Sequence, residues 1–385
     1  MGKPTIRFEG YTDDWEQRKF SDVVDIGNGM DYKHLEEGNI PVYGTGGYML
    51  SVNKALSDDK DAIGIGRKGT IDKPYILRAP FWTVDTLFYC IPKENYDLDF
   101  TSCIFQNVDW KKKDESTGVP SLSKVIINNV ETAIPTFDEQ KKIGNYFRSL
   151  DYLITLHHRK CEETKKLKKF MLQKMFPKKG EKVPDIRFDG FTDDWEQRKL
   201  GELGSLKNGM NFSKEAMGIG FPFVNLQNIF GNNVIDVTNL GKAMAFDSQL
   251  KDYNLLNGDV LFVRSSVKLE GVGEAALVPQ NLENTTYSGF IIRFRDEYGL
   301  DNNFKRFLFG IESVRNQIMA QATNSANKNI SQTVLENLCL KIPNKSEQEK
   351  IGLYFSDIDH LITLHQHKCE ELQNIKKFML QNMFT

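Results

Sequence analysis

The sequence has few cysteines and no pattern that would organise them around a metal or a redox centre. Its 385 residues include five cysteines, with no C-x-x-C pair among them. An odd number of cysteines without paired spacing is typical of free thiols in a reducing compartment. No apolar run is long enough to cross a bilayer, and no signal peptide is recognisable. The sequence therefore predicts a cytoplasmic protein with no membrane partner.

Motifs of the common catalytic classes are also missing. The sequence has no G-x-x-x-x-G-K-[ST] phosphate loop, no G-x-S-x-G nucleophile turn and no N-P-P-aromatic methyltransferase motif. Pro184-Asp185 has no nearby E-x-K that would complete a nuclease site. Catalysis by this chain alone is therefore not expected. The formal net charge of −2 disfavours a molecule that is basic throughout, but it leaves room for local basic patches.

An internal duplication dominates what the sequence does contain. The octapeptide T-D-D-W-E-Q-R-K occurs at 12–19 and again at 192–199, an offset of 180 (192 minus 12). The hexapeptide K-K-F-M-L-Q occurs at 168–173 and 376–381, an offset of 208 (376 minus 168). The insert between these two repeated stretches is therefore 28 residues longer (208 minus 180) in the second half. A repeat of this length indicates a duplicated domain, since solenoid units are much shorter.

The closing stretch of each half predicts a long amphipathic helix. Apolar residues step by three and four along 138–176 and along 346–384, with no internal proline. About 35 helical residues span about 50 Å. Because such a helix cannot bury its stripe alone, its simplest partner is the other copy. The predicted parts are 1–136 (opener and first insert), 137–177 (first helix), 178–344 (second opener and insert) and 345–385 (second helix).

Each insert predicts an α/β domain with a mixed, partly irregular sheet. A helix is expected over 304–322 in the second insert. The β-like runs are 62–66, 75–77, 81–84 and 86–91 in the first insert and 222–226, 259–264 and 290–294 in the second. Two unlike inserts on like frames suggest one task that is carried out on two different targets.

One candidate binding segment follows an apolar strand in each insert. Arginine presents a fork that fits guanine edges or phosphate, lysine supplies charge to phosphate, and serine adds small donors. The alternative is a solvated hairpin tip with incidental charge. The predicted DNA-binding residues of this segment are Arg67, Lys68, Thr70 and Lys73 in the first insert and Arg264, Ser265, Ser266 and Lys268 in the second.

A second candidate segment, small, polar and basic, precedes each long helix. Asparagine and glutamine pair with adenine in the major groove, and lysine reaches guanine or phosphate. The alternative is turn formation or helix capping. The residues of this segment are Ser121 and Lys124 in the first insert and Asn327, Lys328 and Asn329 in the second. Asn225, Gln227 and Asn228 are further candidates in the second insert.

Histidine and cysteine stand four residues apart at the same place on both predicted helices, as His157 and Cys161 and as His365 and Cys369. Each pair lies on one helical face. If the helices meet in register, the four side chains would form a tetrahedral zinc site. The alternative, which we favour, is a layer in the middle of the helix pair where imidazole and thiol pack or hydrogen-bond.

The duplicated organisation resembles the specificity subunit of type I restriction-modification systems. The matching residues are Glu139-Gln140, Lys142-Ile143, Phe147 and Asp151, repeated as Glu347-Gln348, Lys350-Ile351, Phe355 and Asp359, with W-E-Q-R-K at 15–19 and 195–199, G-R-K-G at 66–69, G-D-V-L-F at 258–262 and F-W-T-V-D-T-L-F at 81–88. The resemblance implies a mixed α/β (α+β) fold with a pseudo-twofold repeat. Two α/β target recognition domains would be separated by two long antiparallel coiled-coil helices, and each would read half of a bipartite DNA target.

The same resemblance implies partners that carry the chemistry. Two modification subunits would use S-adenosylmethionine to methylate adenine, and two restriction subunits would use ATP with magnesium, while this chain itself would be non-catalytic and bind no cofactor. The helix pair would act as a ruler for the unread spacer between half-sites. The competing hypotheses are a coiled-coil assembly scaffold whose inserts bind protein or a small ligand, and a metal-stabilised adaptor.

Overall fold

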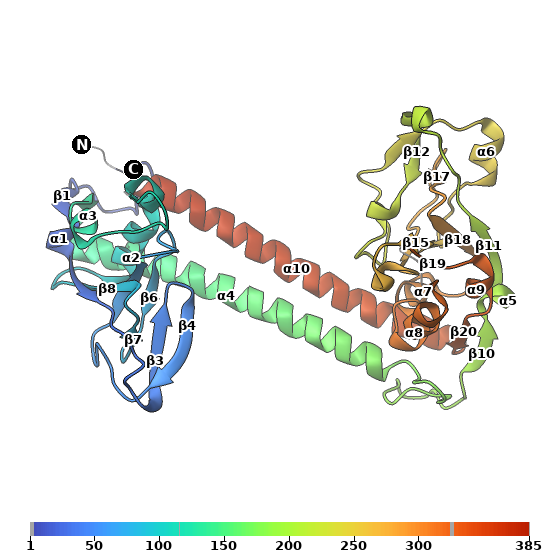
Figure 1. Ribbon diagram of the computed structural model, residues 1–385, viewed down its shortest axis with the longest axis horizontal. Helices are drawn as coiled ribbons and strands as arrows, with labels where there is room; N and C mark the ends of the chain where they lie inside the picture. The colour runs from blue at the N-terminus through green and yellow to red at the C-terminus, as the bar shows by residue number, and fades with distance from the viewer. Residues whose placement is uncertain (1–3, 115, 324–326, 385) are drawn as a thin grey trace. The chain divides into compact units, whose positions relative to one another are not determined.

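Two compact units share the two long helices. The computed structural model describes residues 4–114, 116–323 and 327–384. Residues 1–159 and 365–385 form the first unit, and residues 160–364 form the second. α4 (Phe137–Lys174) and α10 (Lys345–Met383) each pass from one unit into the other (Figure 1). Each unit therefore contains one part of both helices.

Within each unit, the parts of α4 and α10 lie antiparallel to one another. In the first unit, Lys376 Nζ of α10 donates to Asp151 Oδ1 of α4 at 2.6 Å. In the second unit, Lys168 Nζ of α4 donates to Asp359 Oδ1 of α10 at 2.5 Å. The two ion pairs are copies of each other at the offset of 208, which confirms the predicted pair of antiparallel helices. The predicted apolar stripe is buried at Ile143, Phe147, Leu150, Ile351, Phe355 and Ile358.

The repeated opener forms the outer strand of a small ribbon in each unit. β1 (Glu16–Lys19) is antiparallel to β9 (Glu131–Ile134), with Glu16 opposite Ile134. β10 (Glu196–Lys199) is antiparallel to β20 (Cys339–Ile342) in the same register, with Glu196 opposite Ile342. Because β9 and β20 lead directly into the long helices, the ribbon closes each insert at its base.

Two sheets make up the first insert. The four-stranded sheet has the order β2-β8-β5-β6, and every neighbouring pair is antiparallel. The three-stranded sheet has the order β4-β3-β7, in which β7 is parallel to β3. The strands are β2 (Val24–Asn28), β3 (Glu37–Gly44), β4 (Gly47–Val52), β5 (Ala62–Gly66), β6 (Tyr75–Leu77), β7 (Trp82–Thr83) and β8 (Leu87–Pro92).

The second insert repeats this topology despite its different sequence. Its four-stranded sheet has the order β11-β18-β14-β16, and its three-stranded sheet has the order β13-β12-β17 with β17 parallel to β12. The strands are β11 (Gly204–Asn208), β12 (Met217–Val224), β13 (Gly241–Ala243), β14 (Val260–Val263), β16 (Ala275–Leu277), β17 (Thr286–Tyr287) and β18 (Ile291–Asp296). A further ribbon joins β15 (Ser265–Ser266) to β19 (Lys328–Asn329).

Short helices complete the inserts. In the first unit they are α1 (Phe20–Val23), α2 (Leu98–Asn107), α3 (Lys124–Asn128) and the 3₁₀ turn η1 (Trp110–Lys113). In the second unit they are α5 (Leu200–Leu203), α6 (Asp247–Asp252), α7 (Asn302–Leu308), α8 (Glu312–Gln321), α9 (Gln332–Glu336) and the 3₁₀ turns η2 (Lys214–Ala216), η3 (Leu226–Asn228) and η4 (Leu269–Gly271). An aspartate caps α2 and α7 at equivalent places, as Asp97 and Asp301.

The single helix predicted over 304–322 is wrong, because the chain breaks there into α7 and α8. Gly310 lies at the break, and Ile311 has an extended backbone, with φ −70° and ψ 151°. The break lets Phe309 and Ile311 both reach the core, where they are almost fully buried. The ring of Phe309 packs edge-on against Phe262 of β14, with 4.9 Å between centroids. Glycine at this point lowers the helix propensity, and burial of the Phe309 ring stabilises the break between α7 and α8.

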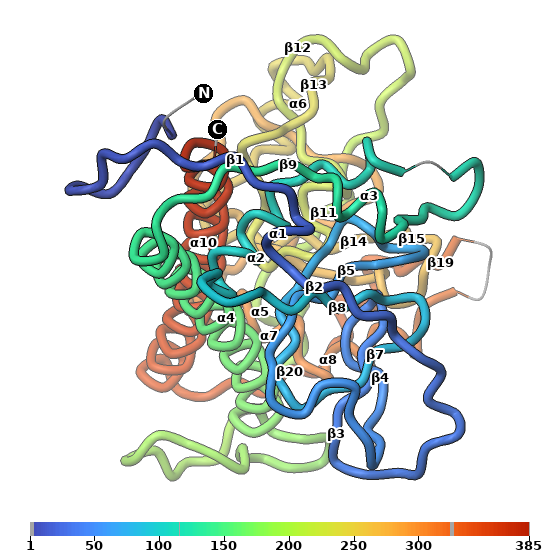
Figure 2. Tube along the Cα trace, turned by 90° about the vertical axis from the view of Figure 1, so that its left-hand side faces the viewer, coloured from blue at the N-terminus to red at the C-terminus, as the bar shows by residue number. Residues whose placement is uncertain are grey.

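Each unit has its core where the insert meets the long helices. In the first unit, Phe100, Phe105 and Trp110 pack with Phe147 of α4 and Leu372 of α10. In the second unit, the corresponding cluster includes Phe176, Trp195, Phe304, Phe307 and Phe355. The first described residues lie beside the end of α10, where Ile6 N–H donates to Asn382 O at 3.1 Å (Figure 2). The helix ends are thus part of the domain cores.

Candidate nucleic-acid interface

In the first unit, the two candidate segments predicted from the sequence lie against each other. The strand-end segment (66–70) begins at the last residue of β5, and the pre-helix segment (116–124) ends at the first residue of α3. Lys68 forms an antiparallel bridge with Ser121. Gly69 N–H donates to Pro120 O at 2.9 Å. The two segments, about 50 residues apart in the chain, therefore form one short ribbon.

The second unit pairs its two segments in the same way. Here the strand-end segment (264–268) follows β14, and the pre-helix segment (323–331) precedes α9. Ser265 lies opposite Asn329, and Ser266 lies opposite Lys328, so that β15 and β19 run side by side (Figure 2). The amide of Asn329 donates to Asn327 O at 2.8 Å. Side chains that the sequence predicted separately are thus presented together on one ribbon in each unit.

The predicted side chains of the first ribbon differ in how far they are available to a ligand. Arg67, Lys68 and Lys73 are exposed, and Thr70 is half-buried. Lys124 donates its ammonium to Ile26 O at 2.7 Å, a contact that fixes α3 to β2. Lys124 therefore has a structural contact, and its DNA-binding role stays a prediction.

The three amide residues predicted near 225–228 do not share one environment. Gln227 is exposed, while Asn225 Oδ1 accepts from Leu226 N–H at 2.8 Å. Asn228 is only 1% exposed. Its Nδ2 donates to the carbonyl oxygens of Asp236 and Asn239, both at 3.1 Å. The structure therefore gives Asn228 the turn-forming role that was the alternative, and removes it from the candidate surface.

Basic residues that the sequence reasoning passed over adjoin the first ribbon. The run Lys111-Lys112-Lys113 forms η1. Lys111 Nζ lies 2.7 Å from Asp72 Oδ2, and this ion pair brings η1 next to the strand-end segment. The hydrogen bond from Lys111 lowers the pKa of Asp72. Three consecutive lysines were the available signal, but nothing in the sequence placed them beside Asp72.

An acidic residue next to this run orders the pre-helix segment. Asp114 Oδ1 accepts from the backbone N–H groups of Ser116 and Ser121, both at 3.0 Å. These backbone hydrogen bonds, that from Ser121 first, lower the pKa of Asp114. The ionised carboxylate, engaged with backbone donors, therefore fixes the loop next to the three lysines.

A cavity of about 540 Å³ opens beside the ribbon of the second unit. Four separate stretches of the chain line it, including Leu226, Ser265, Ser266, Lys268, Phe290 and Asn327. Phe290 is 56% exposed and Val267 is 77% exposed. Exposed apolar side chains among donors suit base edges, because the thymine methyl group and the base faces are apolar. Phe290 had been predicted only as the start of a strand.

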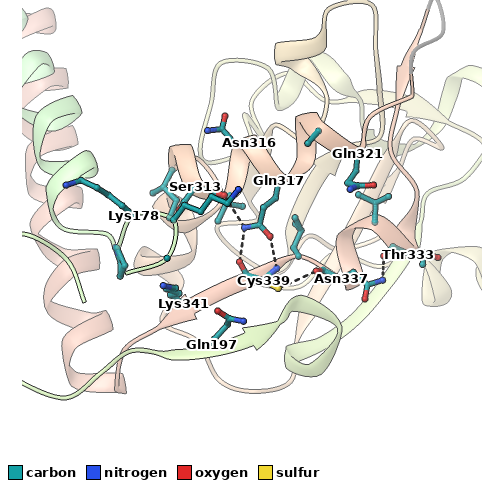
Figure 3. Close-up of a pocket in the computed structure, with 18 of the residues that line it drawn as sticks. Lys178, Gln197, Ser313, Asn316, Gln317, Gln321, Thr333, Asn337, Cys339 and Lys341 are labelled. Carbon is teal, nitrogen blue, oxygen red and sulfur yellow. Dashed lines mark hydrogen bonds between the residues drawn. The ribbon is translucent and has the colours of Figure 1, made fainter. Parts of the chain in front are cut away.

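A second groove in the same unit, of about 810 Å³, contains none of the predicted residues (Figure 3). It lies between α8, α9, β20 and the residues that follow α4. Gln317 Nε2 donates to Cys339 O, and Cys339 N–H donates to Gln317 Oε1, both at 3.0 Å. The carboxamide thus takes the place of a neighbouring strand on the outer edge of β20. This groove contains neither of the two candidate segments, so we do not assign DNA contact to it.

The predicted histidine layer exists as a direct contact. His157 Nδ1 lies 3.0 Å from His365 Nδ1, with 5.2 Å between ring centroids. One imidazole donates and the other accepts, so at least one of the two is neutral. Cys369 Sγ lies 3.9 Å from Ile154 O. Within residues 4–114, 116–323 and 327–384, no group of three or more His, Cys, Asp or Glu side chains is placed to hold a metal ion. The contacts of His157, His365 and Cys369 fit the packing alternative.

Membrane insertion has no support in the helices that the structure describes. Of these, none combines the length and the apolar character that a bilayer-spanning segment needs.

Two inserts of unlike sequence but like topology on a duplicated helical frame define the class of protein, and comparison with known proteins gives the family. The family model of the type I restriction modification DNA specificity domain matches residues 12–166 and 192–374. These matches cover most of the chain, which therefore belongs to this family.

Individual relatives agree with this assignment. The type I restriction enzyme MjaVIII specificity subunit of Methanocaldococcus jannaschii is 24% identical over 290 residues, which are 71% of this chain and 66% of the relative. The type I restriction enzyme EcoKI specificity subunit of Escherichia coli is 27% identical over 151 residues, 39% of this chain and 32% of the relative. The chain thus spans less than two thirds of the length of either relative.

A solved structure has the same fold over the full length. The type I restriction-modification S subunit from M. genitalium superposes with a TM-score of 0.68 and 14% identity, covering 100% of this chain and 99% of that one. The likeness supports the architecture of two inserts and two long helices.

Proposed function

We propose that this chain is a DNA-specificity subunit in which each insert reads one half of a bipartite target. The observation that carries the proposal is the pairing of the strand-end segment with the pre-helix segment in each unit. In both units, the strand-end segment and the pre-helix segment, which lie far apart in sequence, meet at the same place on the same topology. The side chains gathered there are cations, amides and hydroxyls, which are the groups that contact phosphates and base edges.

The chemistry would belong to partners, since the chain offers a reading surface and no catalytic motif. Two modification subunits would bind the duplicated frame and extrude the target adenines from the duplex. They would then methylate these adenines, with S-adenosylmethionine as the methyl donor. Two restriction subunits, which use ATP and magnesium, would join that complex. The long helices would set the number of unread base pairs between the half-sites.

Methylome sequencing tests the proposal. Adenine methylation is mapped genome-wide in cells with this chain and in cells from which it has been deleted. One bipartite motif should lose methylation on deletion and regain it when the gene is restored. Identical methylomes in the two cell lines would contradict the proposal. Binding of the purified chain to that duplex should fall steeply with salt, whereas a protein-binding scaffold would ignore nucleic acid.

A further inference from the structure

An arginine occupies the same place in both inserts. Arg67 directly follows β5, and Arg264 directly follows β14. The backbone N–H of Arg67 donates to Thr86 O, and that of Arg264 donates to Phe290 O, both at 2.8 Å. In each unit the acceptor lies just before the neighbouring strand, β8 or β18. The two arginines are therefore equivalent in the fold, although they are 197 residues apart (264 minus 67) and the repeats are offset by 180 and 208.

The pre-helix segment holds both arginines from the other side. The carbonyl oxygen of Arg67 accepts from Leu122 N–H at 2.9 Å, and that of Arg264 accepts from Ile330 N–H at 3.0 Å. Leu122 and Ile330 are both buried, so they anchor the pre-helix segment to the core. Each arginine is thus fixed by backbone hydrogen bonds on both edges.

The two guanidinium groups are also oriented alike. Arg67 Nη1 lies 3.5 Å from Asp85 O, and Arg264 Nη1 lies 3.3 Å from Gly289 O. Both contacts exceed the usual N–H···O distance of about 2.7–3.2 Å. A guanidinium has five N–H donors, and each contact engages one of them. The carbonyl group therefore engages the guanidinium only weakly and leaves it with donors for a ligand.

Charge distinguishes these two arginines from those that brace the fold. Arg7, Arg187 and Arg295 each form an ion pair with a carboxylate at 2.6–2.7 Å. Across the described ranges, by contrast, neither Arg67 nor Arg264 has an aspartate or glutamate oxygen within salt-bridge distance. Two positive charges are thus held in equivalent positions without a neutralising partner, which favours an external anion.

The neighbours of the two arginines are unlike. Lys68 faces Ser121 in the first ribbon, whereas Ser265 faces Asn329 in the second. Thr86 and Phe290 occupy the equivalent position on the other side. Readers of different sequences must differ where they contact bases. An arginine that occurs in both inserts and is held by equivalent backbone hydrogen bonds is suited to contact what both half-sites share, and every duplex presents the same sugar-phosphate backbone.

We propose that Arg67 and Arg264 are matched phosphate clamps, one for each half-site, and that the unlike residues around them choose the bases. The inference rests on the proposed DNA-reading function. Each clamp sets the position of its ribbon on the duplex. It contributes affinity for any sequence and no discrimination between sequences.

Binding measured against salt tests this inference on the full chain assembled with its modification subunits. Arg67→Gln, Arg264→Gln and the double variant keep hydrogen-bond donors but lose the charge. Each is titrated with the target duplex found by methylome sequencing, with duplexes changed in one half-site, and with an unrelated duplex. Arg67→Lys and Arg264→Lys keep the charge and serve as matched controls.

Each single Gln variant should weaken binding to every duplex by the same factor, about tenfold at low salt, and lower the slope of log affinity against log salt by about 0.9. The double variant should lower that slope by about 1.8. The ratio of target to unrelated affinity should not change, and the lysine variants should keep the wild-type slope.

Three results would contradict the proposal that Arg67 and Arg264 are phosphate clamps. Relaxed discrimination at one base pair with an unchanged slope would make the arginine a base reader. Unchanged binding with a lowered melting temperature would make it a structural brace. If only one of the two Gln variants lowered the slope of log affinity against log salt, the two arginines would not have equivalent roles. If the wild-type complex bound no duplex at all, the proposed function would fall, which is a different outcome from any of these three.

Discussion

Arg7 and Glu139 form a two-pronged ion pair at the start of α4. Arg7 Nε lies 2.7 Å from Glu139 Oε1, and Arg7 Nη2 lies 2.8 Å from Oε2. The Glu139 side chain has no exposed surface. Arg187 and Glu347 repeat both distances at the start of α10. The opener of each half is therefore bound to the start of its own closing helix, and this pairing explains why the two stretches repeat together.

The first prediction concerns this joint. Arg7→Ala and Arg187→Ala should each lower the free energy of unfolding by about 3 kcal/mol, because each leaves a buried carboxylate without its partner. Urea unfolding monitored by circular dichroism measures the change. Arg18→Ala is the matched control, since its pair with Glu16 is exposed on both sides and should change stability by less than about 1 kcal/mol. Equal losses of stability in Arg7→Ala and Arg18→Ala would show that the buried pair of Arg7 with Glu139 stabilises the fold no more than an exposed pair does.

The second prediction reverses a general rule for helical glycine. Replacing glycine by alanine inside a helix normally stabilises it by about 1 kcal/mol. A Cβ at Gly144 of α4 would lie 2.4 Å from Asp97 Oδ1 and 2.8 Å from Phe100 N. At Gly352 of α10 it would lie 2.6 Å from Phe304 N. The long helix could no longer pack against the capped start of α2 or α7. Gly144→Ala and Gly352→Ala should therefore destabilise the protein by roughly 1–3 kcal/mol.

Thermal unfolding of these glycine variants provides the measurement. Gly46→Ala is the control, because a Cβ there meets nothing within 4 Å. A rise in melting temperature for Gly144→Ala would show that the helix start has room to relax.

The sequence predicted the helical frame of this protein better than its candidate binding surface. The long helices followed from apolar periodicity, which is local information, and from the repeat. The ribbon depends on contacts between Lys68 and Ser121, or Ser265 and Asn329, which no local pattern specifies. The sequence could nominate each segment by composition, but it could not separate exposed Gln227 from buried Asn228, because a buried turn and a binding loop use the same amide residues. The interrupted helix at Gly310 was missed because core packing of Phe309 overrode the continuous helical pattern.

The third prediction concerns pH and the segment that joins the two halves. Lys174 and Lys178 both donate to Asp185 Oδ2, at 2.8 and 2.7 Å. These hydrogen bonds, that from Lys174 first, lower the pKa of Asp185 to about 2 from its ordinary value of 3.8. A carboxyl whose pKa is lowered in the folded state stabilises that state above its unfolded pKa, and loses this contribution as the pH falls from about 4 to about 2.

Carboxyl carbon NMR titration measures this directly. Lys174→Met should raise the pKa of Asp185 toward 3.8, because the first of its two donors is lost. Lys179→Met, a neighbouring exposed lysine, is the control and should leave that pKa unchanged. An Asp185 that titrates near 4 in the wild-type protein would show that the joining segment is not held to the end of α4.

The fourth prediction concerns metal. Because His157 and His365 engage each other through Nδ1 and no third ligand approaches in the part of the chain described here, purified protein should contain no stoichiometric zinc. Chelator should leave the melting temperature unchanged, and mass spectrometry of metals should find well under one zinc per chain. If one zinc per chain were found, and if a Cys161→Ser and Cys369→Ser double variant lost it, the hypothesis of a metal-stabilised adaptor would be supported.

The fifth prediction follows from the proposal that the long helices set the spacer. Seven residues, close to two turns, are inserted in α4 after Arg159 and seven in α10 after Leu364, which preserves both the apolar stripe and the antiparallel pairing. Each helix then lengthens by about 10.5 Å, at 1.5 Å per residue. One DNA turn of about 10 base pairs spans about 34–36 Å, so the added length equals about three base pairs.

Methylome sequencing of cells with the lengthened helices should recover the same two half-sites with a spacer that is longer by about three base pairs. The matched control inserts seven residues in α4 alone, so that the pairs Lys376–Asp151 and Lys168–Asp359 can no longer form together, and it should abolish methylation. A double insertion that methylates at the original spacing would remove the helices from any role in measuring the target.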